Sequence, residues 1–265
     1  MNRFLNFKTQ GQPTNSTIVI VHGLFGSLDN WQSLAKKWSE NYYVLSVDVR
    51  NHGKSFHSDH MEFEALAKDL FILIQKEGIG KIHLLGHSMG GKIAMEFAIH
   101  YPEYLASLVI VDVAPYAYTA HHTDVFEMLR NTDLSKFTSR QEIETEIKKY
   151  LNQEDVVQFM MKNIRRNDEN LLFEWKFNAK VLDRDYLSLF QFIPHKGFRG
   201  PTLFIGGERS KYISKETSIH IFDLYPNAKF EFVSNAGHWV HADNPIEFYN
   251  LVTQFITKAS TLIDN

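Results

Sequence analysis

The stretch that decides the fold is Leu84-Leu85-Gly86-His87-Ser88-Met89-Gly90-Gly91-Lys92-Ile93-Ala94. Its apolar start predicts a buried strand, and its end predicts the beginning of a helix. Gly86 and Gly90 complete the pattern G-x-S-x-G, in which a sharp turn between strand and helix holds the serine in a strained backbone conformation. Glycines are needed there because the two backbones pass too close for a Cβ atom. The pattern predicts that the Ser88 hydroxyl projects from the edge of a sheet.

Two other interpretations of this stretch compete with a nucleophilic serine. Gly86, Gly91 and Lys92 also fit the phosphate-binding pattern G-x-x-x-x-G-K, but that motif continues with Ser or Thr, and position 93 is Ile. The mismatch disfavours a nucleotide site. The other alternative is a glycine-rich turn with an exposed serine and no chemistry. The strand before Ser88 and the helix after it favour the nucleophile.

Outward from this turn, strands and helices alternate along the first part of the chain. Strands are expected at residues 17–21, 42–49 and 108–113, and an amphipathic helix at 63–77. This alternation predicts right-handed βαβ units and a parallel sheet. Strands are expected again at 201–207 and 228–233, and helices at 215–225 and 245–258.

The segment between these two parts has a different pattern. From about residue 116 to 194, helical periodicity dominates, with helices expected at 125–130, 140–151, 155–165 and 185–192. We therefore predict an α/β fold with a mostly parallel central sheet flanked by helices. Its core comprises residues 1–115 and 195–265, and residues 116–194 form a helical cap inserted between two strands.

Composition narrows the function classes. A chain of 265 residues suits one α/β domain with an insertion. The net charge of −3 gives no reason to expect a nucleic acid or an anionic membrane as partner. The absence of cysteine excludes disulfides, thiolate metal sites and a cysteine nucleophile, and no metal or cofactor is expected. The polar start and the lack of a long apolar run predict no signal peptide and no membrane span, so a cytoplasmic location is expected.

A serine hydroxyl needs a base, and the chain offers thirteen histidines. His238, in Ala236-Gly237-His238-Trp239, directly follows the last expected strand, where it would project over the carboxyl edge of the sheet beside Ser88. His241 is the nearby competitor, with a structural role expected. His22 is expected to brace its loop, and His52 is expected to be solvated.

The acid that orients the base is less easily assigned. In the usual chain order it follows the strand after the insertion, but the expected position holds Ser210, and Glu208 comes two residues too early. Asp112, at the end of the strand that follows the Ser88 helix, is the alternative carboxylate, and a triad is recognised by geometry. Asp112 could instead cap nearby amides. If Asp112 is the acid, Ser210 is a possible fourth member of the network.

Acyl transfer also requires donors for the developing oxyanion. The N–H after the nucleophile, that of Met89, is one expected donor. The second comes from His22-Gly23-Leu24-Phe25-Gly26, the loop after the first buried strand, with Leu24 preferred over Phe25.

Together these residues resemble the α/β-hydrolase superfamily, and most closely the YbfF-type small esterases. The resemblance spans nearly the whole chain and is carried by residues 22–31, 47–53 with Ser55, 86–92, 112–115 and 236–242. It implies a carboxylesterase or acyl-thioesterase with a small helical cap, an acid at Asp112 and a serine at position 210.

The cap would then cover the substrate pocket. Phe25, Met160 and Trp175 are the expected substrate-binding residues, and Phe126, Met128, Phe159, Met161 and Phe177 could also line an acyl channel unless they only pack the cap onto the core. Arg50, Lys92, Arg165 and Arg166 could meet an anionic group of an acyl-CoA-like substrate, or each could be solvated surface charge.

The leading interpretation is a serine carboxylesterase acting on a small-molecule acyl ester or thioester. A C–C bond hydrolase or a perhydrolase would use the same triad. A dehalogenase or an epoxide hydrolase would need Asp at position 88. A non-catalytic ligand-binding protein of the same fold is the remaining alternative, and the set Ser88, Asp112 and His238 argues against it.

Overall fold

The computed structural model describes residues 4–119, 122–213 and 221–261. Its centre is a seven-stranded sheet in the order β1-β3-β2-β4-β5-β8-β9. Six strands run parallel, and β1 pairs antiparallel with β3 at one edge. The strands are β1 (Phe7–Gln10), β2 (Thr17–Val21), β3 (Tyr43–Val47), β4 (Ile82–His87), β5 (Leu105–Val111), β8 (Thr202–Gly207) and β9 (Ala228–Val233).

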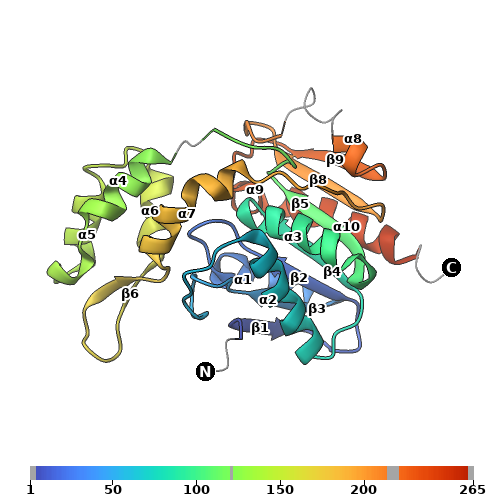
Figure 1. Cartoon of the computed structure of the whole chain (residues 1–265), viewed down its shortest axis with the longest axis horizontal. Coiled ribbons are helices and arrows are strands. Elements are labelled where there is room, and N and C mark those ends of the chain that lie inside the picture. Colours follow the sequence, from blue (N-terminus) through green and yellow to red (C-terminus); the bar gives the residue numbers. More distant parts are fainter. Residues whose placement is uncertain (1–3, 120–121, 214–220, 262–265) are drawn as a thin grey trace.

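Helices cover both faces of this sheet (Figure 1). One face packs against α1 (Gln32–Trp38) and α10 (Pro245–Thr261), and the other against α2 (Phe63–Lys76), α3 (Met89–His100) and the short α8 (Ile221–Leu224). Strands β2, β4 and β5 are buried along their whole length because helices lie on both sides of them. This confirms the predicted mostly parallel α/β sheet.

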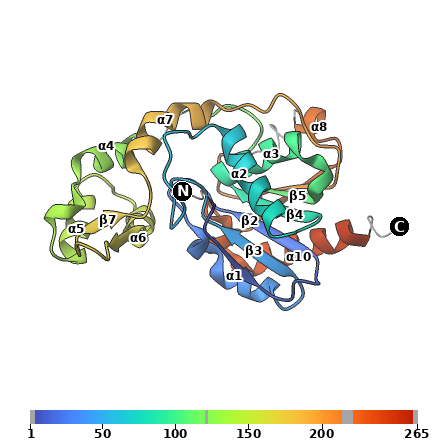
Figure 2. The same ribbon diagram turned by 60° about the horizontal axis from the view of Figure 1, so that its bottom comes forward.

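The chain between β5 and β8 forms a mainly helical insertion. It contains α4 (Thr123–Asn131), α5 (Arg140–Ile147), α6 (Glu154–Lys162), β6 (Ile164–Arg166), β7 (Phe173–Trp175) and α7 (Ala179–Gln191). In two views α4, α5 and α6 lie together at one end of the molecule, and α7 leads back toward the sheet (Figures 1 and 2). The short helices η1 (Leu28–Trp31), η2 (Pro102–Tyr104), η3 (Leu134–Lys136) and α9 (Val240–Asp243) complete the described elements.

The hairpin of β6 and β7 differs from the predicted helix at 155–165. Helix α6 ends at Lys162 because the Asn163 side chain turns back to donate to the Phe159 carbonyl, and the Asn163 carbonyl instead accepts from the Lys176 N–H. The chain then pairs as a strand, supported by a 2.7 Å ion pair between Arg165 and Glu174 across the hairpin.

Two further differences concern short segments. Strand β1 was not predicted, because four residues at a sheet edge with only one partner carry little periodicity. Of the helix predicted at 215–225, residues 214–220 lie outside the described residues, and α8 is the described part. No helix in the described ranges is both long and apolar enough to span a membrane.

The register of the sheet brings its functional loops together. Val21 of β2 lies opposite Gly86 of β4, and Val111 of β5 lies opposite both His87 and Ile205. Parallel strands end at the same edge of the sheet, so the loops after β2, β4, β5 and β8 meet there. This edge carries the candidate site.

Candidate active site

Ser88 occupies the turn between β4 and α3 with φ 55° and ψ −118°. This left-handed conformation is strained for a residue with a side chain. Close backbone approach explains the flanking glycines: a Cβ on Gly90 would lie 2.3 Å from the Val21 carbonyl oxygen, and one on Gly86 would lie 2.1 Å from the Gly90 oxygen. The sheet and α3 thus fix the serine at the carboxyl edge.

Asp112 directly follows β5, the strand next to β4, and is fully buried. It also has a positive φ, 51°, and its N–H continues the sheet by donating to the Ile205 carbonyl. Its Oδ1 accepts from the Gly207 N–H at 3.1 Å. Two side chains share its other oxygen: Ser210 Oγ donates to Oδ2 at 2.6 Å, and Nδ1 of His238 lies 2.7 Å from it.

His238 is held from several sides. Because Nδ1 donates to Asp112, the neutral ring carries its lone pair on Nε2. The Tyr212 ring stacks on the imidazole with centroids 4.2 Å apart. His87 donates from Nε2 to the His238 carbonyl at 2.8 Å, a role that we did not predict from the sequence. The structure therefore brings Ser88, Asp112, His238 and Ser210 to one edge of the sheet.

The loop after β2 is braced by two buried histidines, His22 and His52, whose tilted rings lie with centroids 5.1 Å apart. Nε2 of His22 accepts from the Val49 N–H, and Nε2 of His52 accepts from the Phe25 N–H at 3.3 Å. Burial lowers the pKa of His52 to about 3, which keeps the ring neutral and able to accept. The bracing by His22 agrees with its expected role, whereas the expectation that His52 is solvated was wrong.

The two predicted oxyanion donors, Leu24 and Met89, differ from Phe25 in whether the backbone N–H is already hydrogen-bonded. The Leu24 N–H makes no hydrogen bond among those of the described residues, whereas the Phe25 N–H is engaged by His52. Met89 is the first residue of α3, and N–H groups of a first helical turn have no acceptor within the helix. Leu24, Phe25, Ser88 and Met89 all line the same cavity.

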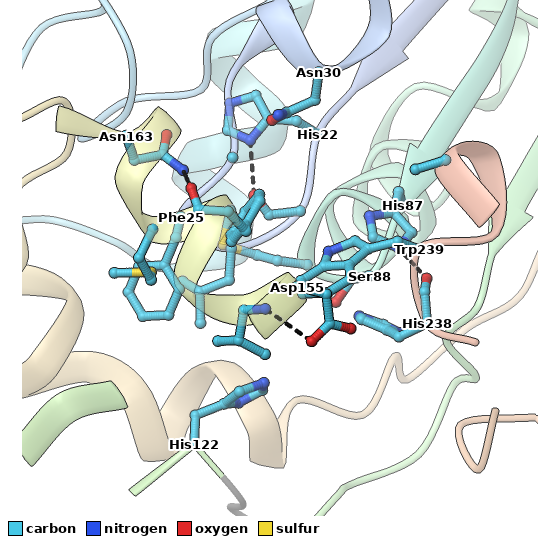
Figure 3. A pocket seen from close by; sticks show the side chains of 18 of the residues that line it. His22, Phe25, Asn30, His87, Ser88, His122, Asp155, Asn163, His238 and Trp239 are labelled. Atoms are coloured by element: carbon cyan, nitrogen blue, oxygen red, sulfur yellow. Dashed lines mark hydrogen bonds between the residues drawn. The ribbon is translucent and has the colours of Figure 1, made fainter. Parts of the chain in front are cut away.

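This cavity, of about 1160 Å³, lies between the sheet edge and the insertion. In Figure 3 Ser88, His238 and Trp239 lie together on one side of it, and Phe25 and Asn163 lie on another. Trp239 also contacts Phe159 of α6, with ring centroids 5.2 Å apart. Apolar side chains from both the core and the insertion line it: Phe25, Val113, Val125, Phe159, Met160, Leu189 and Phe190.

The predicted substrate-binding residues divide into two groups. Phe25, Met160 and Phe159 line the cavity. Trp175 is not among the described lining residues, and its ring stacks on Phe177 with centroids 5.3 Å apart. The remaining candidates are buried within the insertion and its contact with the core: Phe126, Met128, Met161 and Phe177.

The candidate anion contacts are occupied by other groups. Arg50 pairs with Asp69 at 2.6 Å, Arg165 pairs with Glu174, and Arg166 donates to the carbonyls of Leu171 and Thr138. Lys92 lines the cavity, but its ammonium group donates to backbone carbonyls. Within the described residues, no group of three or more His, Asp or Glu side chains is arranged to hold a metal ion.

Comparison with known proteins extends this description. Residues 16–245 match the α/β-hydrolase fold family. The chain is an α/β hydrolase. This hydrolase is 34% identical to esterase YbfF of Escherichia coli over 248 residues, which is 93% of this chain and 95% of that protein. It is likewise 34% identical to the sn-1-specific diacylglycerol lipase ABHD11 of Danio rerio over 258 residues, covering 93% and 80% of the two chains.

A solved structure agrees with these relatives. The hydrolase superposes on a marine microorganism esterase with a TM-score of 0.92 at 33% identity, covering 96% of this chain and all of the other. The predicted membership among YbfF-type esterases is therefore confirmed.

Proposed function

We infer that this hydrolase is a serine carboxylesterase, with Ser88 as nucleophile, His238 as general base and Asp112 as the orienting acid. The observation that carries the proposal is the 2.7 Å contact between His238 Nδ1 and Asp112 Oδ2 beside the strained Ser88 turn. A ring that donates from Nδ1 presents the Nε2 lone pair to a serine proton. The buried carboxylate then stabilises the imidazolium that forms.

Acylation follows from this arrangement. Ser88 Oγ attacks the carbonyl carbon of the ester while its proton passes to His238 Nε2. The carbonyl oxygen becomes an oxyanion, and the N–H groups of Leu24 and Met89 stabilise it. The carbon–oxygen bond of the ester then breaks, and the imidazolium gives its proton to the departing alcohol. The acyl group remains on Ser88.

Deacylation uses the same groups in reverse. A water molecule gives its proton to His238 Nε2 and attacks the acyl carbon, and the bond to Ser88 Oγ breaks as that oxygen is reprotonated. The products are a carboxylic acid and the free enzyme. The Ser210 hydroxyl supports this cycle as a fourth member, because its 2.6 Å hydrogen bond holds the same Asp112 oxygen that orients His238.

Residues 116–194 serve as a cap over the site. Val125, Met160 and Leu189 of this segment line the cavity together with Phe25 of the core, which suits an apolar acyl chain. Carboxylic esters and acyl thioesters, including acyl-CoA-like molecules, share the carbonyl that Ser88 would attack. The names of the relatives, an esterase and a diacylglycerol lipase, support the ester.

A stopped-flow assay with p-nitrophenyl acetate tests this proposal. We expect a burst of p-nitrophenolate equal to about one equivalent of enzyme wherever acylation outpaces deacylation, and loss of both burst and turnover in Ser88→Ala. A tightly bound ester that is not hydrolysed by the wild-type protein would point to a ligand-binding protein instead. A parallel panel of acyl thioesters compares the two substrate classes.

A further inference from the structure

Lys92 is a buried cation one helical turn beyond Ser88. Its own N–H donates to the Ser88 carbonyl, and only 3% of the residue is exposed. The ammonium group donates to the carbonyl oxygens of Phe192 at 2.6 Å, Tyr116 at 2.9 Å and Phe190 at 3.5 Å. No carboxylate of the described residues lies within ion-pair distance of it. Carbonyl dipoles, together with the Tyr118 and Phe192 rings at 5.1 and 5.6 Å, therefore surround the ammonium group.

Burying such a cation is costly: desolvation lowers the pKa of Lys92 to about 7. Part of the compensation comes from helix α7, since Phe190 lies in its last turn and Phe192 is its C-cap. The carbonyls at the end of a helix lack intrahelical partners and carry partial negative charge, which favours a cation there.

The three carbonyls belong to the two ends of the insertion. Tyr116 lies on the chain that enters it after β5, and Phe190 and Phe192 lie on the chain that leaves it. These two segments also bond directly, through the Tyr118 N–H and the Phe190 carbonyl at 3.0 Å. A single ammonium group thus ties both ends of the insertion to the helix that follows the predicted nucleophile.

The opposite end of α7 is also attached to the core. The Asn178 N–H donates to the Asn51 carbonyl at 2.9 Å, and the two side chains bond at 3.2 Å. Leu189 and Phe190, at the Lys92 end of α7, line the cavity. The position of that end therefore sets the shape of the cavity wall.

We propose that Lys92 is a positioning residue for substrate selection: it holds the end of α7 against α3, so that Leu189 and Phe190 contact the acyl chain of a substrate bound at Ser88. This role rests on the proposed esterase function. Lys92 acts through α7 and not on the reacting atoms. Removing the ammonium group should release α7 and weaken the binding of long acyl chains while the chemistry at Ser88 continues.

The kinetic test uses Lys92→Met, which keeps the length and apolar stem, with Lys92→Arg as the conservative variant and exposed Lys196→Met as the matched control. For Lys92→Met, we expect KM for p-nitrophenyl octanoate to rise at least about tenfold, because several buried CH₂ contacts are lost. We expect kcat for p-nitrophenyl acetate, per site titrated with a fluorophosphonate, to stay within about threefold. Lys92→Arg should restore part of the octanoate KM, and Lys196→Met should match the wild type.

A purely structural role predicts another outcome. If Lys92→Met only lowers the number of titratable sites, or affects acetate and octanoate by the same factor, the proposal is wrong. Hydrogen exchange gives a reading that needs no activity: the Tyr118 amide should exchange at least about tenfold faster in Lys92→Met than in the wild type. Unchanged exchange would also overturn the proposal.

If the wild type hydrolyses neither ester, the esterase proposal fails and hydrogen exchange alone decides whether Lys92 holds the insertion. If Lys92→Met does not fold, Lys92→Gln replaces it.

Discussion

Asp112 Oδ2 lies 2.7 Å from His238 Nδ1, although the two residues are 126 positions apart in the chain. Asp112 comes from the end of β5, next to the strand of Ser88, and not from the loop after β8 where the usual chain order places an acid. Ser210 occupies that loop and donates to the same carboxylate oxygen. Asp112 therefore carries the carboxylate, and Ser210 occupies the position where the usual chain order places it. The two side chains meet at Asp112 Oδ2.

This relationship predicts unequal effects of two substitutions. Asp112→Asn keeps the shape but removes the charge and favours the wrong imidazole tautomer, so we expect kcat to fall by about 10³- to 10⁴-fold. Ser210→Ala removes one hydrogen bond to an oxygen that keeps its other partner, and we expect a loss below about tenfold. Steady-state kinetics on p-nitrophenyl acetate measures both. Small and similar losses in the two variants would refute Asp112 as the acid.

The bracing of the loop after β2 predicts a second effect. His52→Asn removes the Nε2 acceptor of the Phe25 N–H and frees the loop that carries Leu24. We expect kcat per titrated site to fall at least about tenfold, because oxyanion donors act only when held in place. His83→Asn is the control, since His83, near the start of β4, is also buried but bonds the Ser107 hydroxyl of β5. Equal kcat values for the two variants would argue against this role for His52.

The turn at Ser88 predicts the cost of adding one methyl group. A Cβ on Gly90 would meet the carbonyl oxygens of Val21 and His22 at 2.3 and 2.5 Å, so Gly90→Ala should lose more than about 3 kcal/mol of unfolding free energy or fail to fold. Gly80→Ala is the control, because nothing lies within 4 Å of its Cβ position. Urea unfolding compares them. Equal stability of the two variants would contradict the close approach of α3 to β2.

Buried histidines predict how stability depends on pH. Burial lowers the pKa of His52 and His241 to about 3 and that of His83 to about 4. Below pH 6.5 the unfolded chain takes up protons that the folded protein does not, so stability is fully present above 6.5 and declines as the pH falls toward 4. In this window each such histidine lowers the free energy of unfolding by about 1 kcal/mol for every pH unit of decrease.

The measurement is the urea midpoint between pH 7 and pH 4.5. We expect a clear decrease for the wild type and a shallower one for His83→Asn, because that variant has one titrating group fewer in the unfolded chain. A midpoint that stays constant over this range would show that these rings do not remain neutral in the folded protein.

The sequence predicted the sheet and its edge because these depend on local patterns. The apolar run at 17–21, the apolar residues Leu84 and Leu85 before the turn, and the glycines around Ser88 each carry their own signal. The order of the strands then brings the loops together. Asp112 could be selected because position 210 is Ser and because Asp112 ends the neighbouring strand. The family resemblance supported the same assignment.

Other features depend on contacts between distant segments. His52 was expected in solvent because a loop histidine gives no sign that Phe25 will donate to it. Lys92 was expected as a possible contact for an anionic substrate group. The sequence around it does not indicate that the carbonyls of Tyr116 and Phe192 accept from its ammonium group. The β6–β7 hairpin was hidden in a helical pattern that Asn163 interrupts by bonding to Phe159.

The central claim is that Ser88 forms the acyl-enzyme. The most direct measurement is mass spectrometry of the protein after reaction with a fluorophosphonate, followed by peptide mapping. The account predicts one adduct per chain on Ser88, its absence in Ser88→Ala, and strongly slowed formation in Asp112→Asn. A Ser88→Ala protein that still hydrolyses p-nitrophenyl acetate at the wild-type rate, or an adduct on another residue, would contradict it.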